Sequence, residues 1–234
     1  MHRIAIPDEI LARSQQARGG SEHIFETIDP RRTAHIVVDL QNGFMAEGAA
    51  VEVPFAREIV PDVNRISAAL RDAGGTNVFL RYTCDPAEAQ PWTTRYTEYL
   101  SPERRDLHTA AFTRGAEQWQ LWPGLDVKPG DPIVDKTRFS AFVPGTCALD
   151  ALLRERGIDT VIVTGTLTNV CCESTARDAM QRSYRVIFVA DGNAALTDAE
   201  HNATLGNMIM LFADVMTTDE VLGVIERNRL RGAA

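Results

Sequence analysis

The stretch from Thr160 to Met180, TVIVTGTLTNVCCESTARDAM, constrains the fold of this 234-residue chain more than any other part of it. A β-branched apolar run at residues 161–163 is followed by Gly165 and then by a segment with helical spacing that carries Cys171 and Cys172. This order predicts a buried strand, a tight loop and a helix.

The two adjacent cysteines are expected to face different surroundings. Successive helical residues point about 100° apart, so neighbours cannot face the same place. Cys172 falls in line with Ala176 and Ala179 on an apolar stripe, whereas Cys171 shares its face with the polar Asp178. We therefore expect Cys172 in the core and Cys171 in a pocket as a nucleophile. The free N–H groups and the dipole at a helix start favour its thiolate.

Composition restricts the class of protein. The chain is 44% hydrophobic and 24% charged, so it can bury one full core, and we expect a single domain over residues 31–234 behind a polar arm at 1–30. The net charge of -8 disfavours nucleic acid and anionic membranes and favours a small-molecule substrate. No apolar run reaches the roughly 18 residues of a membrane span. Four cysteines without a C-x-x-C pair point to a reducing, cytoplasmic setting.

Strand-like and helix-like segments alternate along the chain. Apolar runs predict strands at residues 34–40, 77–82, 131–135, 161–163, 185–190 and 214–216. Helical spacing predicts helices at residues 56–73, 146–156, 198–212 and 218–227. The alternation predicts an α/β fold, a three-layer α/β/α sandwich with a mainly parallel six-stranded sheet. Residues 83–130 read as a long irregular segment, which is typical of lids and binding loops.

Three reactive side chains stand at equivalent places in this scheme. Asp39 ends the first strand, Lys136 follows the third, and Cys171 follows the fourth. The carboxyl ends of parallel strands form the ligand crevice of an open sheet, so these side chains should converge there. Taken one by one, each has a plainer interpretation: a turn aspartate, a solvated lysine and a buried cysteine.

The segments that carry these residues resemble a known family. IVVDLQNGF around Asp39, DKTRFSAF around Lys136 and VTGTLTNVCCESTARDA around Cys171 are similar to the three signatures of the isochorismatase-like cysteine hydrolases, in the same order over residues 28–217. That superfamily includes nicotinamidases, N-carbamoylsarcosine amidases and ureidoacrylate amidohydrolases. The resemblance implies a Rossmann-like topology and an amidohydrolase that cleaves a C–N bond of a small amide, ureido or N-carbamoyl compound.

The resemblance also implies a mechanism. Asp39 would take the proton of Cys171, Lys136 would hold the carboxylate and lower the thiol pKa, and the acyl group would pass through a thioester. The oxyanion would lie between the backbone N–H groups of Leu167 and Cys171, after a cis peptide between Thr166 and Leu167. Protonated Asp39 would then donate its proton to the departing amine.

The substrate is less defined. By position, the pocket walls are expected to be Gln41, Phe44, Tyr82, Phe139 and Leu167. The resemblance is strongest to the ureidoacrylate and N-carbamoyl amino acid branch. Ureidoacrylate enzymes, however, carry Asn and Trp where this chain has Tyr82 and Cys84, so the substrate stays open.

We expect neither a metal nor another cofactor. The histidines show no ligand spacing, and the Asp-x-His motif of nicotinamidases is replaced here by RYTCDPAE at residues 81–88. Three alternatives remain: an isochorismatase-type hydrolase of another small metabolite, a redox-responsive protein using Cys171 and Cys172, and a non-catalytic interaction protein on a hydrolase fold. We expect a homodimer or homotetramer.

Overall fold

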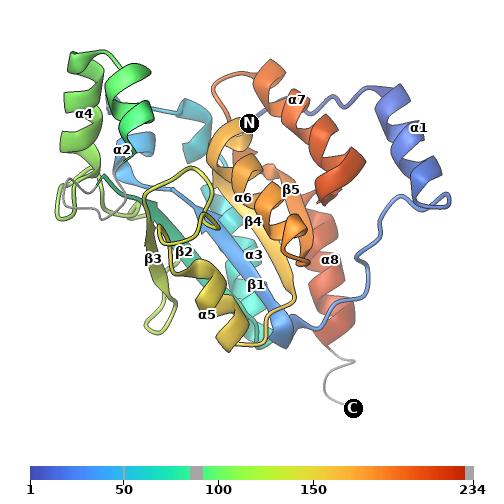
Figure 1. The fold of residues 1–234 in the computed structure, drawn as a ribbon. Coiled ribbons are helices and arrows are strands. Elements are labelled where there is room, and N and C mark those ends of the chain that lie inside the picture. The colour runs from blue at the N-terminus through green and yellow to red at the C-terminus, as the bar shows by residue number, and fades with distance from the viewer. Residues whose placement is uncertain (50, 85–91, 230–234) are drawn as a thin grey trace.

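A six-stranded sheet forms the centre of the computed structural model, which describes residues 1–49, 51–84 and 92–229 (Figure 1). The strand order is β3-β2-β1-β4-β5-β6, and every neighbouring pair is parallel. The strands are β1 (Thr33–Val38), β2 (Thr76–Tyr82), β3 (Ile133–Lys136), β4 (Thr160–Thr166), β5 (Arg185–Ala194) and β6 (Asp214–Met216). The predicted α/β fold with a six-stranded parallel sheet is confirmed.

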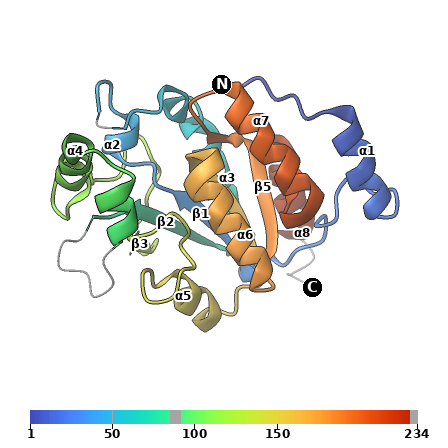
Figure 2. The same cartoon turned by 45° about the horizontal axis from the view of Figure 1, so that its top comes forward.

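Helices cover both faces of the sheet (Figures 1 and 2). The α-helices are α1 (Asp8–Ala17), α2 (Asn42–Met45), α3 (Val60–Asp72), α4 (Pro102–Phe112), α5 (Leu149–Glu155), α6 (Glu173–Gln181), α7 (Asp198–Asn207) and α8 (Thr218–Arg229). The shorter 3-10 and π turns are η1 (Pro30–Arg32), η2 (Pro54–Arg57), η3 (Thr94–Glu98), η4 (Thr168–Cys172) and η5 (Met208–Phe212). Apolar side chains of α3 and α8 cover one face, and those of α5, α6 and α7 cover the other. No helix in the described ranges is long and apolar enough to cross a membrane.

Burial on both faces explains why the central strands read as continuous apolar runs. Every residue of β1 and of β4 is buried. The chain runs outward from β1 to β2 and β3 on one side, and from β4 to β5 and β6 on the other, so the order reverses between β1 and β4. The crevice of such a sheet lies outside the carboxyl ends of the strands at this reversal.

Gly165 allows the last residues of β4 to lie close to β1. It pairs with Val38 at the end of β1 and has a φ of 127°. A Cβ atom built on Gly165 would lie 2.1 Å from the Val38 carbonyl oxygen. Only glycine fits this position, because a side chain would collide with backbone.

Two helices differ from the sequence predictions. The arm at residues 1–30 contains α1, and the segment expected to be irregular contains η3 and α4. Both α-helices are rich in charged and polar residues, so their apolar spacing is weak. Their starts are nevertheless favourable: Asp8 and Glu9 lie in the first turn of α1, and α4 begins with Pro102 after Ser101, which accepts a hydrogen bond from Arg104 N–H. Residues 85–91 of the segment at 83–130 lie outside the described residues.

The helix expected after β4 begins as a π-helix. η4 holds the two cysteines, and regular α-helix starts only at Glu173. Short π segments in helices occur frequently at functional sites.

Candidate active site

A buried ion pair lies at the carboxyl edge of the sheet. Lys136, the last residue of β3, reaches past β2 and places its Nζ 5.2 Å from the centre of the Tyr82 ring. The same Nζ lies 2.7 Å from Oδ2 of Asp39, which directly follows β1, and both side chains are 0% exposed. Lys136 Nζ also donates a hydrogen bond to the Arg138 carbonyl at 3.0 Å.

Asp39 has an unusual backbone conformation. Its φ is +54°, in the left-handed region that residues other than glycine seldom adopt. Its N–H donates to the Leu80 carbonyl of β2 at 3.2 Å, and its own carbonyl accepts from Gln41 N–H at 2.8 Å. Such conformations persist where neighbouring bonds hold them, and they cluster at functional sites.

Cys171 joins this pair from η4. The thiol is buried, and the Asp39 carboxylate and the Lys136 ammonium both lie close enough to it to shift its pKa. Cys172 is fully buried in the core formed with the α6 stripe that includes Ala176. The side chains of Asp39, Lys136 and Cys171 therefore meet at one place, contributed by the ends of three different strands.

Burial dominates the protonation of these groups. Burial raises the pKa of the Cys171 thiol, and the negative charge of Asp39 raises it further. The positive charge of Lys136 lowers it, but the net result is a pKa well above that of an ordinary cysteine. Burial also raises the pKa of Asp39, although Lys136 pulls it back. Burial lowers the pKa of Lys136, but Asp39 and Cys171 outweigh it and the net shift is upward. The direction of the Cys171 shift is thus opposite to the lowered thiol pKa that the helix start and Lys136 led us to expect.

The turn between β4 and η4 is tightly bonded. The peptide between Thr166 and Leu167 is cis, as the family resemblance implied. The Leu167 carbonyl accepts hydrogen bonds from the N–H groups of Val170 and Cys172, both at 3.1 Å. These bonds hold Cys171 at a fixed point of the turn.

One wall beside these residues is aromatic and consists of Tyr82, Trp92, Tyr96 and Phe139. The Tyr82 hydroxyl lies 2.5 Å from the Tyr96 hydroxyl, and the Tyr96 hydroxyl lies 2.7 Å from Cys84 Sγ. Burial raises the pKa of both tyrosines, so their hydroxyls stay neutral. The aromatic wall therefore offers neutral hydroxyl groups.

The outer part of the aromatic wall carries a positive charge. The rings of Trp92 and Phe139 meet edge to face at 4.7 Å. The Arg95 guanidinium lies 5.5 Å from the Phe139 ring centre, and its buried Nε has no hydrogen-bond partner among the described residues. A guanidinium in this position can hold an anionic group.

Two of the expected pocket residues have structural roles. Both amide hydrogens of Gln41 donate to backbone carbonyls, of Tyr82 at 3.1 Å and Trp119 at 2.8 Å, and its Oε1 accepts from Tyr82 N–H at 2.7 Å. Gln41 thus ties the end of β1 to the end of β2. Phe44 is nearly buried, and its ring packs 4.7 Å from that of Phe112. Neither residue presents a free polar group to a substrate.

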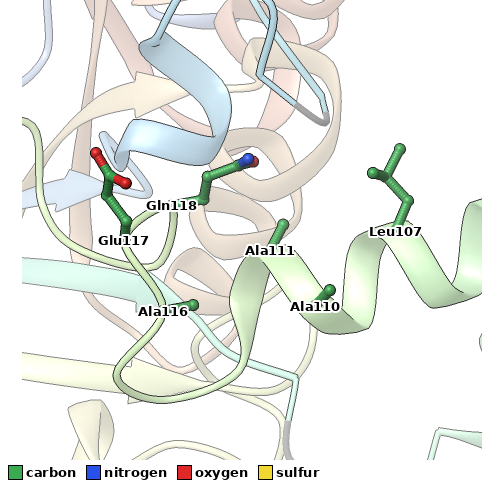
Figure 3. Close-up of a pocket in the computed structure, with 6 residues that line it drawn as sticks. All are labelled: Leu107, Ala110, Ala111, Ala116, Glu117 and Gln118. Carbon is green, nitrogen blue, oxygen red and sulfur yellow. The ribbon is translucent and has the colours of Figure 1, made fainter.

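Sequence reasoning missed Trp92, Arg95 and Tyr96 as wall residues, because the segment around them has no apolar spacing. A hollow of about 230 Å³ elsewhere on the surface, between α4 and the loop after it, has no nucleophile in its lining (Figure 3). It is lined by Leu107, Ala110, Ala111, Ala116, Glu117 and Gln118.

Within the described ranges, no three His, Cys, Asp or Glu side chains gather as a metal site would require. Residues 85–88 of the segment at 81–88 lie outside those ranges, so the absence of a metal stays a prediction. The four cysteines are free thiols, and Cys171 and Cys172 are both buried. A redox role for this pair therefore has no support from accessibility.

The chain is similar to proteins of a known family. The model of the isochorismatase domain matches residues 33–220. The ureidoacrylate amidohydrolase RutB of Methylobacterium radiotolerans is 33% identical over 216 residues, which cover 86% of this chain and 83% of that protein.

Two solved structures are also similar to the chain. A cysteine hydrolase from Pseudomonas syringae pv. phaseolicola has a TM-score of 0.76 at 33% identity, over 86% of this chain and 95% of the other. N-carbamoylsarcosine amidase from Thermoplasma acidophilum has a TM-score of 0.64 at 26% identity, over 80% and 97%.

Proposed function

Because this chain belongs to the isochorismatase family, we propose that it is a cysteine-dependent amidohydrolase that cleaves a C–N bond of a small amide, ureido or N-carbamoyl compound. The observation that carries the proposal is the buried Asp39–Lys136 ion pair with the buried Cys171 thiol beside it. A thiol, a base and a fixed positive charge in contact are the groups that acyl transfer through a thioester requires. The amidohydrolase and amidase relatives support this reading.

The first half of the reaction uses Asp39 as a general base. Cys171 Sγ attacks the substrate carbonyl carbon while its proton passes to the Asp39 carboxylate, so no free thiolate has to exist beforehand. The carbonyl oxygen becomes an oxyanion, which the N–H groups of Leu167 and Cys171 would stabilise. Lys136 stays charged and keeps Asp39 ionised until the attack.

Collapse of the oxyanion breaks the C–N bond. The leaving nitrogen takes the proton from Asp39, and the acyl group remains on sulfur as a thioester. A water molecule then gives a proton to the Asp39 carboxylate and attacks the thioester carbon. The C–S bond breaks, and sulfur recovers the proton from Asp39. The products are ammonia or a carbamate and the remaining part of the substrate.

The aromatic wall narrows the substrate class. Its inner part, Tyr82 with Tyr96, offers neutral hydroxyls that can bond to an amide or ureido group. Its outer part carries Arg95, which favours those ureido and N-carbamoyl compounds that also bear a carboxylate. Ureidoacrylate and N-carbamoylsarcosine, named by the relatives, are the first compounds to test.

Ammonia release from a panel of ureido, N-carbamoyl and primary amide compounds tests the proposal. The wild-type protein should release ammonia from at least one class, and Cys171→Ala should lose that activity. Cys172→Ala is the matched control, since Cys172 lies one residue away but packs in the core. Undiminished turnover by Cys171→Ala would contradict the covalent mechanism.

A further inference from the structure

The first residues of the arm form a strap over α7. Residues 2–5, named here the strap, are fastened by Asn202 of α7: its Oδ1 accepts from Ala5 N–H at 2.6 Å, and its Nδ2 donates to the Arg3 carbonyl at 2.8 Å. Both ribbon views place the N-terminus beside α7 (Figures 1 and 2). The strap lies outside residues 33–220, so the family match does not account for it.

The strap inserts one histidine into the body. The His2 side chain is only 3% exposed, and its ring lies between those of Phe55, at 4.2 Å, and His201, at 4.4 Å. Ala195 N–H donates to His2 Nε2 at 2.9 Å, so this nitrogen carries no proton. The proton is therefore on Nδ1, which lies 2.8 Å from Asp198 Oδ1. Both ring nitrogens of His2 are satisfied in one orientation.

His201 connects the strap to the turn of the active site. Its ring is parallel to that of His2 within 14°, and its Nδ1 lies 2.9 Å from the Thr168 hydroxyl. Both His201 and Thr168 are 0% exposed. Thr168 is the first residue of η4, directly after Leu167 and three residues before Cys171.

A second route leads from His2 to the same turn. Ala195, which bonds to His2, follows the last residue of β5. That residue, Ala194, pairs with Thr166 of β4, and its carbonyl accepts from the Thr166 hydroxyl at 3.2 Å. The strap is thus linked indirectly to both neighbours of Leu167: to Thr166 through Ala194 and Ala195, and to Thr168 through His201.

We propose that the strap positions the turn that holds Leu167 and Cys171, with His2, His201 and Thr168 as positioning residues. The inference rests on the proposed function, which assigns the nucleophile and two oxyanion donors to this turn. Those N–H groups act only if they point at the oxyanion, and a misplacement of about 1 Å can lower turnover by about a hundredfold. Removing the strap would leave a buried imidazole without its stacking partner, directly behind the turn.

The test compares two variants that break the contacts between the strap and the turn with two matched control variants. Thr168→Val removes only the hydroxyl that meets His201, and Thr168→Ser restores it. His2→Ala removes the ring of the strap. Arg3→Ala shortens an exposed side chain of the same strap, and the hydrogen bonds of Arg3 to other described residues are made by its backbone. We expect Thr168→Val and His2→Ala to lower kcat about tenfold or more at nearly unchanged KM, with both controls within about twofold of wild type.

A second readout needs no substrate. The rate at which iodoacetamide alkylates Cys171, followed by mass spectrometry of its peptide, should fall about threefold or more in Thr168→Val and His2→Ala. If the wild-type protein hydrolyses none of the amides, the proposed function fails, and this rate still decides about the strap.

Two results would overturn the inference. One is a Thr168→Val protein with wild-type kcat and alkylation rate. The other is a Thr168→Ser protein as slow as Thr168→Val, because the hydroxyl would then not be the contact that matters. A folded His2→Ala protein with wild-type kcat and alkylation rate would likewise exclude a role for the strap. If His2→Ala does not fold, Asn202→Ala, which removes the two hydrogen bonds that fasten the strap to α7, takes its place.

Discussion

Replacing Lys136 with methionine removes the positive charge from the buried pair while keeping a long side chain. In the wild-type protein, Lys136 Nζ lies 2.7 Å from Asp39 Oδ2, and neither side chain is exposed to water. Removing one partner of a buried ion pair costs about 3 to 5 kcal/mol, because the other charge is left unpaired. We expect Lys136→Met to lose stability of this order wherever Asp39 remains ionised.

The loss should depend on pH with a definite sign. Burial raises the pKa of Asp39, and in Lys136→Met no ammonium opposes it. In the unfolded chain the same carboxyl has a pKa of about 3.9. A carboxyl whose folded pKa is the higher contributes stability below about pH 4, and this contribution is lost as pH rises towards the folded pKa, by about 1.4 kcal/mol for each pH unit. Lys136→Met should therefore be destabilised more at about pH 8 than at about pH 5.

Urea denaturation at these two pH values measures the effect. The control is Asp39→Asn combined with Lys136→Met, which places an uncharged amide beside the methionine. The double variant should recover stability relative to Lys136→Met at the higher pH and lose the extra pH dependence. The idea that Asp39 and Lys136 form a charged pair excluded from water would be refuted by either of two results. One is a Lys136→Met protein with the same free energy of unfolding at both pH values, and the other is a free energy of unfolding within about 1 kcal/mol of wild type.

Other predictions concern activity. Cys171→Ser should abolish turnover, and Cys172→Ala should retain it with a modest loss of thermal stability, as activity assays and melting curves will report. The rate should rise as Asp39 loses its proton, with an acid limb above the ordinary carboxyl pKa of about 4, and should fall only when Lys136 deprotonates above its usual pKa; a pH–rate profile checks both limbs. Exhaustive chelation should leave activity intact while iodoacetamide destroys it, and activity restored by added zinc or iron would contradict the metal-free mechanism. Arg95→Gln should raise KM about tenfold or more for a ureido compound with a carboxylate and leave KM for its methyl ester unchanged.

Strand-end placement was predictable because it follows from hydrophobic runs. Residues 34–40 and 131–135 are short apolar segments, and the polar residues at their ends, Asp39 and Lys136, had to reach the same edge of a parallel sheet. Helical geometry also predicted different surroundings for Cys171 and Cys172, but both cysteines are buried in the same apolar cluster. These inferences depend on local pattern, which the sequence contains in full.

Properties that depend on tertiary burial were not predictable. The helix dipole favours a lowered pKa at Cys171, but the desolvation that raises the pKa of this thiol depends on what covers it. Gln41 read as a pocket residue, because nothing local reveals that the Trp119 carbonyl takes one of its hydrogens. The contacts of Arg95 depend equally on Phe139, far along the chain.

The close contact at Gly165 fixes the position of Asp39 relative to Cys171 independently of the residues that form the aromatic wall. The proposed base, Asp39, follows β1 and the proposed nucleophile, Cys171, follows β4, and the spacing of these strands is set where Gly165 meets Val38. The relative position of Asp39 and Cys171 is therefore set by the sheet, whereas the aromatic wall, apart from Tyr82 at the end of β2, comes from the segments after β2 and β3. Substitutions at Trp92 or Arg95 can change which compound is accepted without disturbing how its bond is broken. The chain is in this sense modular, and new substrates can be sought by varying those segments alone.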